Sequence, residues 1–130
     1  MKDVSFFRRN LPGIFWTVLI LVLMGIPGNR FPEIKSFWEW LITDKLIHLF
    51  LFGVWAYLII RQNKTQYISN PRRFLINTLI AGAILSALAE ILQEFVFVNR
   101  SGDFYDWMAN MAGMIFGITL YVVVHRKKSG

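Results

Sequence analysis

Long apolar runs separated by short charged segments constrain this chain more than any other feature of its sequence. Four such runs occur, and a helix needs about 20 apolar residues to cross the hydrocarbon core of a bilayer. A mean hydropathy of +0.47 is too high for a soluble domain of 130 residues. We therefore predict an all-α membrane protein, a single transmembrane domain over 1–130 built as an antiparallel bundle of four spans. The expected spans are 11–26, 44–60, 74–98 and 104–124.

The first run follows a short basic arm, residues 1–10, a pattern that also begins a secretory signal peptide. Its 16 residues would extend about 24 Å as a helix, slightly less than a bilayer core of about 30 Å. No small-residue cleavage site follows, and Ile26-Pro27 is a poor context for cleavage. We expect this run to be retained as the first span.

The segment 31–43 is aromatic and of mixed polarity, with apolar residues recurring at helical spacing. Pro32 is suitably placed for the first turn of a helix, and Trp38 and Trp40 are typical anchors at a membrane–water interface. The pattern predicts a short interfacial helix between spans one and two. A loop covering the residues beneath it is the alternative.

Basic residues are unevenly distributed between the two sides of the predicted bundle. Ten lysines and arginines fall on the side of the two termini and the 61–73 loop, and four fall on the other side. Because all the loops are short, this asymmetry places both termini in the cytoplasm. A net charge of +6 located at the ends of apolar runs does not indicate a nucleic-acid partner. The absence of cysteine excludes disulfides and thiolate-bound metal.

Polar residues form one narrow stripe at the beginning of the fourth run. With about 100° of rotation per residue, Asp103, Asp106, Asn110, Gly113 and Gly117 lie within about 80° of one another. Polar groups at the edge of an apolar span are expected to face other protein groups or water rather than lipid. The two glycines predict close approach of a neighbouring helix, for which the third run, with its small residues 82 and 83, is the expected partner; dimerisation is the alternative.

Two other runs carry polar residues at the same predicted depth. The third run starts on the cytoplasmic side, so Glu90 lies about 24 Å along it and Gln93 one turn further, both in the outer leaflet. A carboxylate inside a span is costly and by default indicates function. The second run starts on the outer side, and its first turns contain Asp44, Lys45 and His48.

The order and spacing of these residues resemble those of a known family. The motifs are Asp44-Lys45-x-x-His48, Glu90-x-x-Gln93 and Arg100-x-x-Asp103-x-x-Asp106-x-x-x-Asn110 with the following glycines, and they cover about 44–124. They are similar to those of the VanZ-like family of small bacterial integral membrane proteins. The resemblance implies a multi-pass protein of the bacterial cytoplasmic membrane and a link to glycopeptide resistance of the teicoplanin type. It implies no particular reaction.

Each of these residues also has a purely structural interpretation. Asp44 and Asp103 could be helix N-caps, and Asp106 is favoured in a first turn by the helix dipole. Capping accounts for neither His48 nor Glu90. A structural ion pair of Glu90, or a hydrogen-bonded packing role for His48, remains open.

Three functional hypotheses follow. The first is a pocket in the outer leaflet that binds an anionic lipid or a cell-wall precursor, with Lys45 and Arg100 holding its phosphate. The second is an intramembrane enzyme in which His48 is the base and Glu90 or Asp106 the acid. The third is a structural scaffold with a buried polar network. The six residues assigned to binding are Asp44, Lys45, Gln93, Arg100, Asp103 and Asn110.

No cofactor is expected. The spacing matches no standard metal motif such as H-E-x-x-H. A divalent ion held by His48 and the neighbouring carboxylates is the alternative to this prediction.

Overall fold

The fold is all-helical, as predicted. The computed structural model describes residues 2–24, 37–95 and 104–127, with side chains described at 5–24, 45–95 and 104–126. Four of its helices are long and apolar enough to cross a membrane. The helices are α1 (Lys2–Met24), α2 (Phe37–Gln62), α3 (Lys64–Ser69), α4 (Pro71–Phe95) and α5 (Phe104–Lys127).

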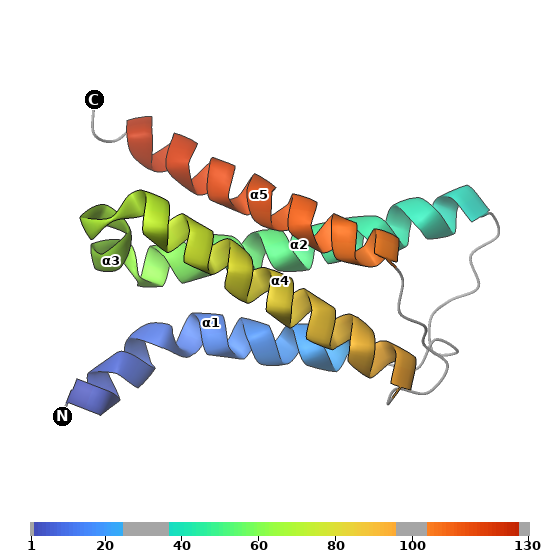
Figure 1. The fold of residues 1–130 in the computed structure, drawn as a ribbon, viewed down its shortest axis with the longest axis horizontal. Coiled ribbons are helices and arrows are strands. Elements are labelled where there is room, and N and C mark those ends of the chain that lie inside the picture. Colours follow the sequence, from blue (N-terminus) through green and yellow to red (C-terminus); the bar gives the residue numbers. More distant parts are fainter. Residues whose placement is uncertain (1, 25–36, 96–103, 128–130) are drawn as a thin grey trace.

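Helix α2 runs through the middle of the bundle and packs against each of the other helices (Figure 1). Its most extensive packing is with α5, and α4 packs against both of them. The beginning of α1, the end of α5 and the short α3 lie at one end of the bundle, while α4 ends and α5 begins at the other (Figure 1). This arrangement is that of antiparallel neighbours joined in sequence.

Helices α1 and α2 begin at least seven residues earlier than the sequence predicts. Helix α1 begins at Lys2, so the basic arm is part of the first helix rather than a separate segment. Helix α2 begins at Phe37, so residues 37–43 continue into the second span instead of forming a separate interfacial helix. The physical reason is that no proline or glycine interrupts this stretch. Residues 31–36 of the predicted interfacial helix lie outside the described residues.

Pro12 lies inside α1 and frees backbone groups that a neighbouring helix satisfies. Proline lacks the amide that would bond to the carbonyl four residues earlier, and its ring crowds the preceding turn. The next amide, that of Gly13, donates to Gln62 Oε1 at 3.1 Å, which ties α1 to the end of α2. A β-carbon at Gly13 would collide with the Gln62 side chain. Because these atoms are the end of a flexible side chain, a larger residue at this position would displace Gln62 and lose the hydrogen bond rather than separate the helices.

The polar loop predicted at 61–73 contains a short helix of six residues, α3. Helix α4 then begins at Pro71, three residues before the predicted start. Asn70 Oδ1 accepts a hydrogen bond from the Arg73 amide at 3.2 Å, and proline is favoured in a first helical turn. Asn70-Pro71 is thus the N-terminal cap of a span as well as a turn.

Apolar side chains are buried between the helices and also cover the outside of the bundle. Ile20, Phe52, Trp55, Ala89 and Met114 belong to one buried cluster. Large apolar side chains are also exposed along all four long helices. A helix that is apolar on both its buried and its exposed faces is suited to a lipid environment.

The glycine pair of α5 packs against α2, not against α4 as predicted. A β-carbon at Gly113 would collide with the backbone carbonyl of Leu49, and one at Gly117 with that of Gly53. Gly53 in turn faces the Gly113 carbonyl, whose oxygen lies 3.0 Å from its hypothetical β-carbon. Three glycines therefore form a backbone-to-backbone seam between α2 and α5. The small residue of α4, Gly82, accommodates Met114 instead.

Candidate functional site

Six polar or charged side chains from three helices meet inside the bundle, and we call this cluster the polar centre. Four of its members are buried, with His48 at 2%, Asp106 at 6% and both Ser86 and Asn110 at 0% exposure. Buried polar groups at a helix interface are stable only when they bond to one another. The polar centre consists of Lys45 and His48 from α2, Ser86 and Glu90 from α4, and Asp106 and Asn110 from α5.

Asn110 links α4 to α2 through its amide group. Its Nδ2 donates to Ser86 Oγ at 2.7 Å, and its Oδ1 lies 2.9 Å from His48 Nδ1. Because the amide oxygen can only accept, this arrangement puts the imidazole proton on Nδ1. The other ring nitrogen of His48, Nε2, is then directed toward the carboxylates.

Asp106 contacts two residues of α2, Lys45 and His48. Its Oδ1 accepts a hydrogen bond from the Lys45 ammonium and forms an ion pair with it. Its Oδ2 lies 3.7 Å from His48 Nε2. Lys45 and His48 are three residues apart, so they lie on the same side of α2, about one turn from each other. The carboxylate of Asp106, in the first turn of α5, therefore faces both of them.

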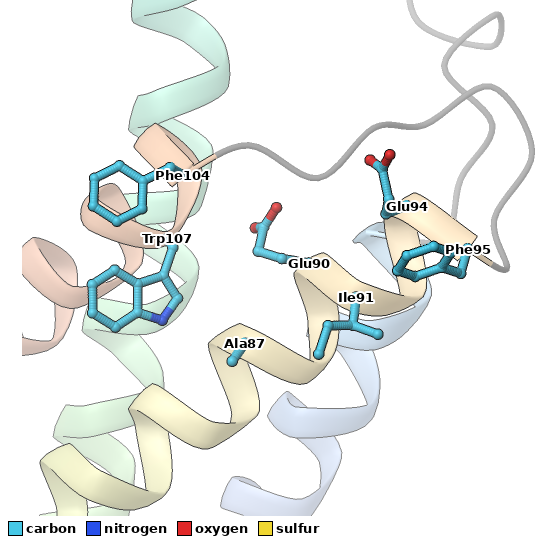
Figure 2. A pocket seen from close by; sticks show the side chains of 7 residues that line it. All are labelled: Ala87, Glu90, Ile91, Glu94, Phe95, Phe104 and Trp107. Carbon is cyan, nitrogen blue, oxygen red and sulfur yellow. The ribbon is translucent and has the colours of Figure 1, made fainter.

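His48, Glu90 and Asp106 together form a group suited to holding a cation. Each offers one nitrogen or oxygen atom, and these three atoms lie within 4.8 Å of one another. The three residues come from three different helices, so their separation in sequence gives no local motif. Figure 2 shows the Glu90 carboxylate extending from α4 toward the beginning of α5.

A pocket of about 430 Å³ adjoins the polar centre between α4 and α5 (Figure 2). Glu90 belongs to both, since its carboxylate reaches the polar centre and its side chain lines the pocket. The rings of Phe104 and Trp107 stack, with centroids 6.0 Å apart and an interplanar angle of 19°. The pocket is lined by Ala87, Glu90, Ile91, Glu94, Phe95, Phe104 and Trp107. We call it the lateral pocket.

A second pocket, of about 360 Å³, lies at the opposite end of the bundle between α3 and the end of α5. The sequence analysis did not predict it. Its rim is basic, with Lys64 and Arg126, and its wall includes Tyr121, whose ring stacks on His125 at 3.9 Å. The two pockets thus differ in charge, since the lateral pocket is lined by carboxylates.

The structure places the predicted site residues in three groups. His48, Glu90 and Asp106, assigned to chemistry, lie together, and Lys45 and Asn110 bond directly to members of that group. Gln93 is directed elsewhere, because its Nε2 donates to the Met24 carbonyl of α1 at 3.3 Å. Asp44 lies in α2, but its side chain is not among those described, and Arg100 and Asp103 lie outside the described residues.

Ser86 and the residues that line the lateral pocket, apart from Glu90, were not assigned to the site from the sequence. Ser86 bonds to Asn110 and lies four residues before Glu90, on the same face of α4. This spacing was the signal in the sequence that could have identified it. Trp107 lines the lateral pocket, but its position on an apolar helix resembles that of any interfacial tryptophan.

Comparison with known proteins identifies a family. The family described as VanZ/LLP1 matches residues 6–125, which is most of the chain. Neither the curated proteins nor the solved structures include a significant match. The match includes every residue of the polar centre and of the lateral pocket. Four helices of the chain are long and apolar enough to cross a membrane. The chain therefore belongs to the VanZ/LLP1 family.

Proposed function

We propose that this VanZ-family protein binds the polar head of an anionic lipid or lipid-linked cell-wall precursor, with the head in the polar centre and the apolar part along the lateral pocket. One observation carries the proposal: Glu90 is shared by the buried polar centre and a largely apolar pocket of about 430 Å³. Ligand sites are typically apolar cavities with a few converging polar groups. The polar centre thus suits the head of an amphiphile, and the adjoining lateral pocket suits its apolar part.

The charges of the site indicate which kind of head group it suits. Glu90 and Glu94 line the pocket, and Lys45 is engaged by Asp106. Ionised carboxylates only accept hydrogen bonds, so the ligand must bring donors such as hydroxyl or amide groups. A phosphate on the same head group requires a cation, which Lys45 and, outside the described residues, Arg100 would supply. A lipid-linked sugar or peptide precursor meets both requirements better than a simple phospholipid.

This proposal includes a location and a physiological context. The uneven distribution of basic residues supports insertion in the bacterial cytoplasmic membrane with both termini inside. The polar centre would then lie toward the outer face, where cell-wall precursors are used. A link to resistance against glycopeptides of the teicoplanin type is part of the proposal because the family is known for it.

A second candidate function is catalysis on the same ligand, and the grouping of His48 with two carboxylates within 4.8 Å favours it. His48 would act as base through Nε2, while its Nδ1 is held by Asn110. Glu90 or Asp106 would act as acid. Binding and catalysis differ in one result: the enzyme would release a changed amphiphile, and a binding protein would retain it unchanged.

Lipid-directed mass spectrometry of the purified protein tests binding. Ala87→Trp places a large side chain in the lateral pocket, while Ala81→Trp adds the same bulk at an exposed position of the same helix. We expect wild type and Ala81→Trp to retain one distinct amphiphile and Ala87→Trp to lose at least about 90% of it, corresponding to about 1.4 kcal/mol per tenfold loss of affinity. Equal retention by both variants would contradict the proposal.

A further inference from the structure

We infer that His48, Glu90 and Asp106 bind one divalent transition-metal ion. The first observation is the donor set, which consists of one imidazole nitrogen and two carboxylate oxygens within 4.8 Å of one another. Neighbouring donors on a tetrahedral or octahedral ion at about 2.0–2.2 Å are themselves about 2.8–3.6 Å apart. The 3.7 Å between His48 Nε2 and Asp106 Oδ2 is slightly longer than this, so a small side-chain adjustment brings both atoms onto one ion.

The second observation is the orientation of the imidazole. Its Nδ1 is engaged by Asn110 Oδ1 at 2.9 Å, and the Asn110 amide is itself oriented by Ser86 at 2.7 Å. Histidines that bind metal typically donate their second ring N–H to such a fixed acceptor, which sets the tautomer and the direction of the ring. His48 therefore presents the lone pair of Nε2 on the side where the two carboxylates lie.

The charges of His48, Glu90 and Asp106 favour a metal ion over a shared proton between the three side chains. The lone pair of Nε2 and an ionised carboxylate repel each other unless a proton or a metal ion lies between them, and Lys45 offsets part of the charge of Asp106. A proton can be shared by only one pair of atoms at a time, whereas a metal ion accepts all three donors together. Three side chains from three helices converge here. This convergence favours the metal.

Binding of a divalent ion would also resolve the charge requirement of the proposed ligand, and in this respect the inference rests on the proposed function. With Lys45 and a neutral His48, the two carboxylates leave the polar centre with a net charge of −1. A divalent ion changes this to +1, which suits a phosphate-bearing head group. Because Glu90 also lines the lateral pocket, the fourth coordination position would open toward it, as in metal sites that bind an exogenous ligand.

The mixed nitrogen and oxygen donors suit zinc or manganese better than calcium, which prefers six or more oxygens. The test uses the full chain purified through a metal-free affinity tag, with elemental analysis of the purified protein. Metal-free protein is then titrated with ZnCl₂, MnCl₂ or CaCl₂ by calorimetry. We expect about one ion per chain, with zinc or manganese bound more tightly than calcium.

Matched variants locate the ion. Glu90→Gln keeps the shape of the side chain, and His48→Gln is paired with His125→Gln, the other histidine, at the opposite end of the bundle. We expect the first two variants to lose the ion and His125→Gln to keep it. Asn110→Leu should weaken affinity about 10- to 100-fold, since it removes the partner of Nδ1. Circular dichroism and size-exclusion profiles identify any variant that fails to fold.

Wild-type protein gives a test that needs no variant. An ion that binds only the folded state raises the unfolding temperature with its concentration. Absence of this shift together with absence of zinc and manganese would overturn the inference and leave His48 as a charged partner of the carboxylates.

Ala87→Trp separates the two proposals: it should lose the amphiphile and keep the ion. An amphiphile retained by wild type that takes up neither zinc nor manganese would contradict the metal inference alone, and an ion without any amphiphile would contradict the proposed function alone.

Discussion

The ion pair between Lys45 and Asp106 is partly shielded from solvent, with side-chain exposures of 19% and 8%. Removing one partner of such a pair leaves the other charge without compensation, which costs more than removing both. This asymmetry applies particularly at Asp106, because its second oxygen already faces His48. The pair therefore affects stability as well as any function.

A double-mutant cycle tests this pair. We expect Lys45→Met and Asp106→Asn each to lower the free energy of unfolding by about 1–3 kcal/mol. The double variant should lose less than the sum, with a coupling free energy of about 0.5–3 kcal/mol. Reversible unfolding in mixed micelles, followed by circular dichroism, measures these values. Lys64→Met, at the other end of the bundle, is the control, and strict additivity of the two variants would contradict the interaction.

At the level of single residues, the sequence predicts depth better than it predicts direction. Helix length and rise place His48, Glu90 and Asp106 at one level, and the structure shows that their side chains also face one another. Gln93 shares that level, but three residues after Glu90 it is rotated by about 300°, or 60° short of a full turn. That rotation is enough to direct it to the Met24 carbonyl of α1 instead of to the polar centre.

At the level of helices, the closest packing in the bundle is the glycine seam between α2 and α5. Small residues let helix backbones approach within lipid, where packing rather than hydrophobic burial drives association. The periodicity of Gly113 and Gly117 predicts the face of α5 on which they lie but not the helix that occupies it. Both α2 and α4 contain a glycine that could have matched, and the three-dimensional order of the helices decides between them.

Glycine substitutions distinguish the two neighbours of α5. Gly113→Ala and Gly117→Ala place a methyl group against backbone carbonyls, which cannot move without separating the helices. We expect each to cost about 1–3 kcal/mol. At Gly82 the methyl group would meet the end of the Met114 side chain, which is flexible, so Gly82→Ala should cost less. Unfolding free energies measured in the same micelles would contradict this packing if Gly82→Ala proved the most damaging.

Helix boundaries show a second limit of prediction from sequence. Charged residues at the start of α1 suggested an arm, and tryptophans before the second span suggested a separate helix. Neither kind of residue breaks a helix, and α1 continues even through Pro12 and Gly13. Helices α1 and α2 accordingly extend through both stretches. The four spans themselves were predictable because apolar length is a strong signal.

At the level of the whole molecule, the two ends of the bundle differ in chemical character. At one end lie the beginning of α1, the end of α5 and α3 (Figure 1), and the pocket with the basic rim is formed there by α3 and α5. The other is the end where α5 begins, and Asp106 of the polar centre lies in its first turn. In a cytoplasmic membrane the basic end is expected inside, so the polar centre would face outward.

Thiol labelling tests this orientation, because the chain contains no cysteine. Single cysteines are introduced at Ser69, at the end of α3, and at Ser101, in the segment between α4 and α5. We expect a membrane-impermeant maleimide to label Ser101→Cys in intact cells and Ser69→Cys only after permeabilisation. The reverse pattern would place the polar centre toward the cytoplasm.

The central claim is that an amphiphile occupies the lateral pocket in the membrane itself, and photocrosslinking measures this most directly. A photoreactive phenylalanine analogue replaces Trp107, which lines the pocket, or Met108, which is 48% exposed on the outside of α5. After irradiation of whole membranes, the crosslinked lipid is identified by mass spectrometry. We predict one distinct phosphate-bearing amphiphile at position 107 and the bulk mixture of phospholipids at position 108. The same bulk mixture at both positions would contradict the claim.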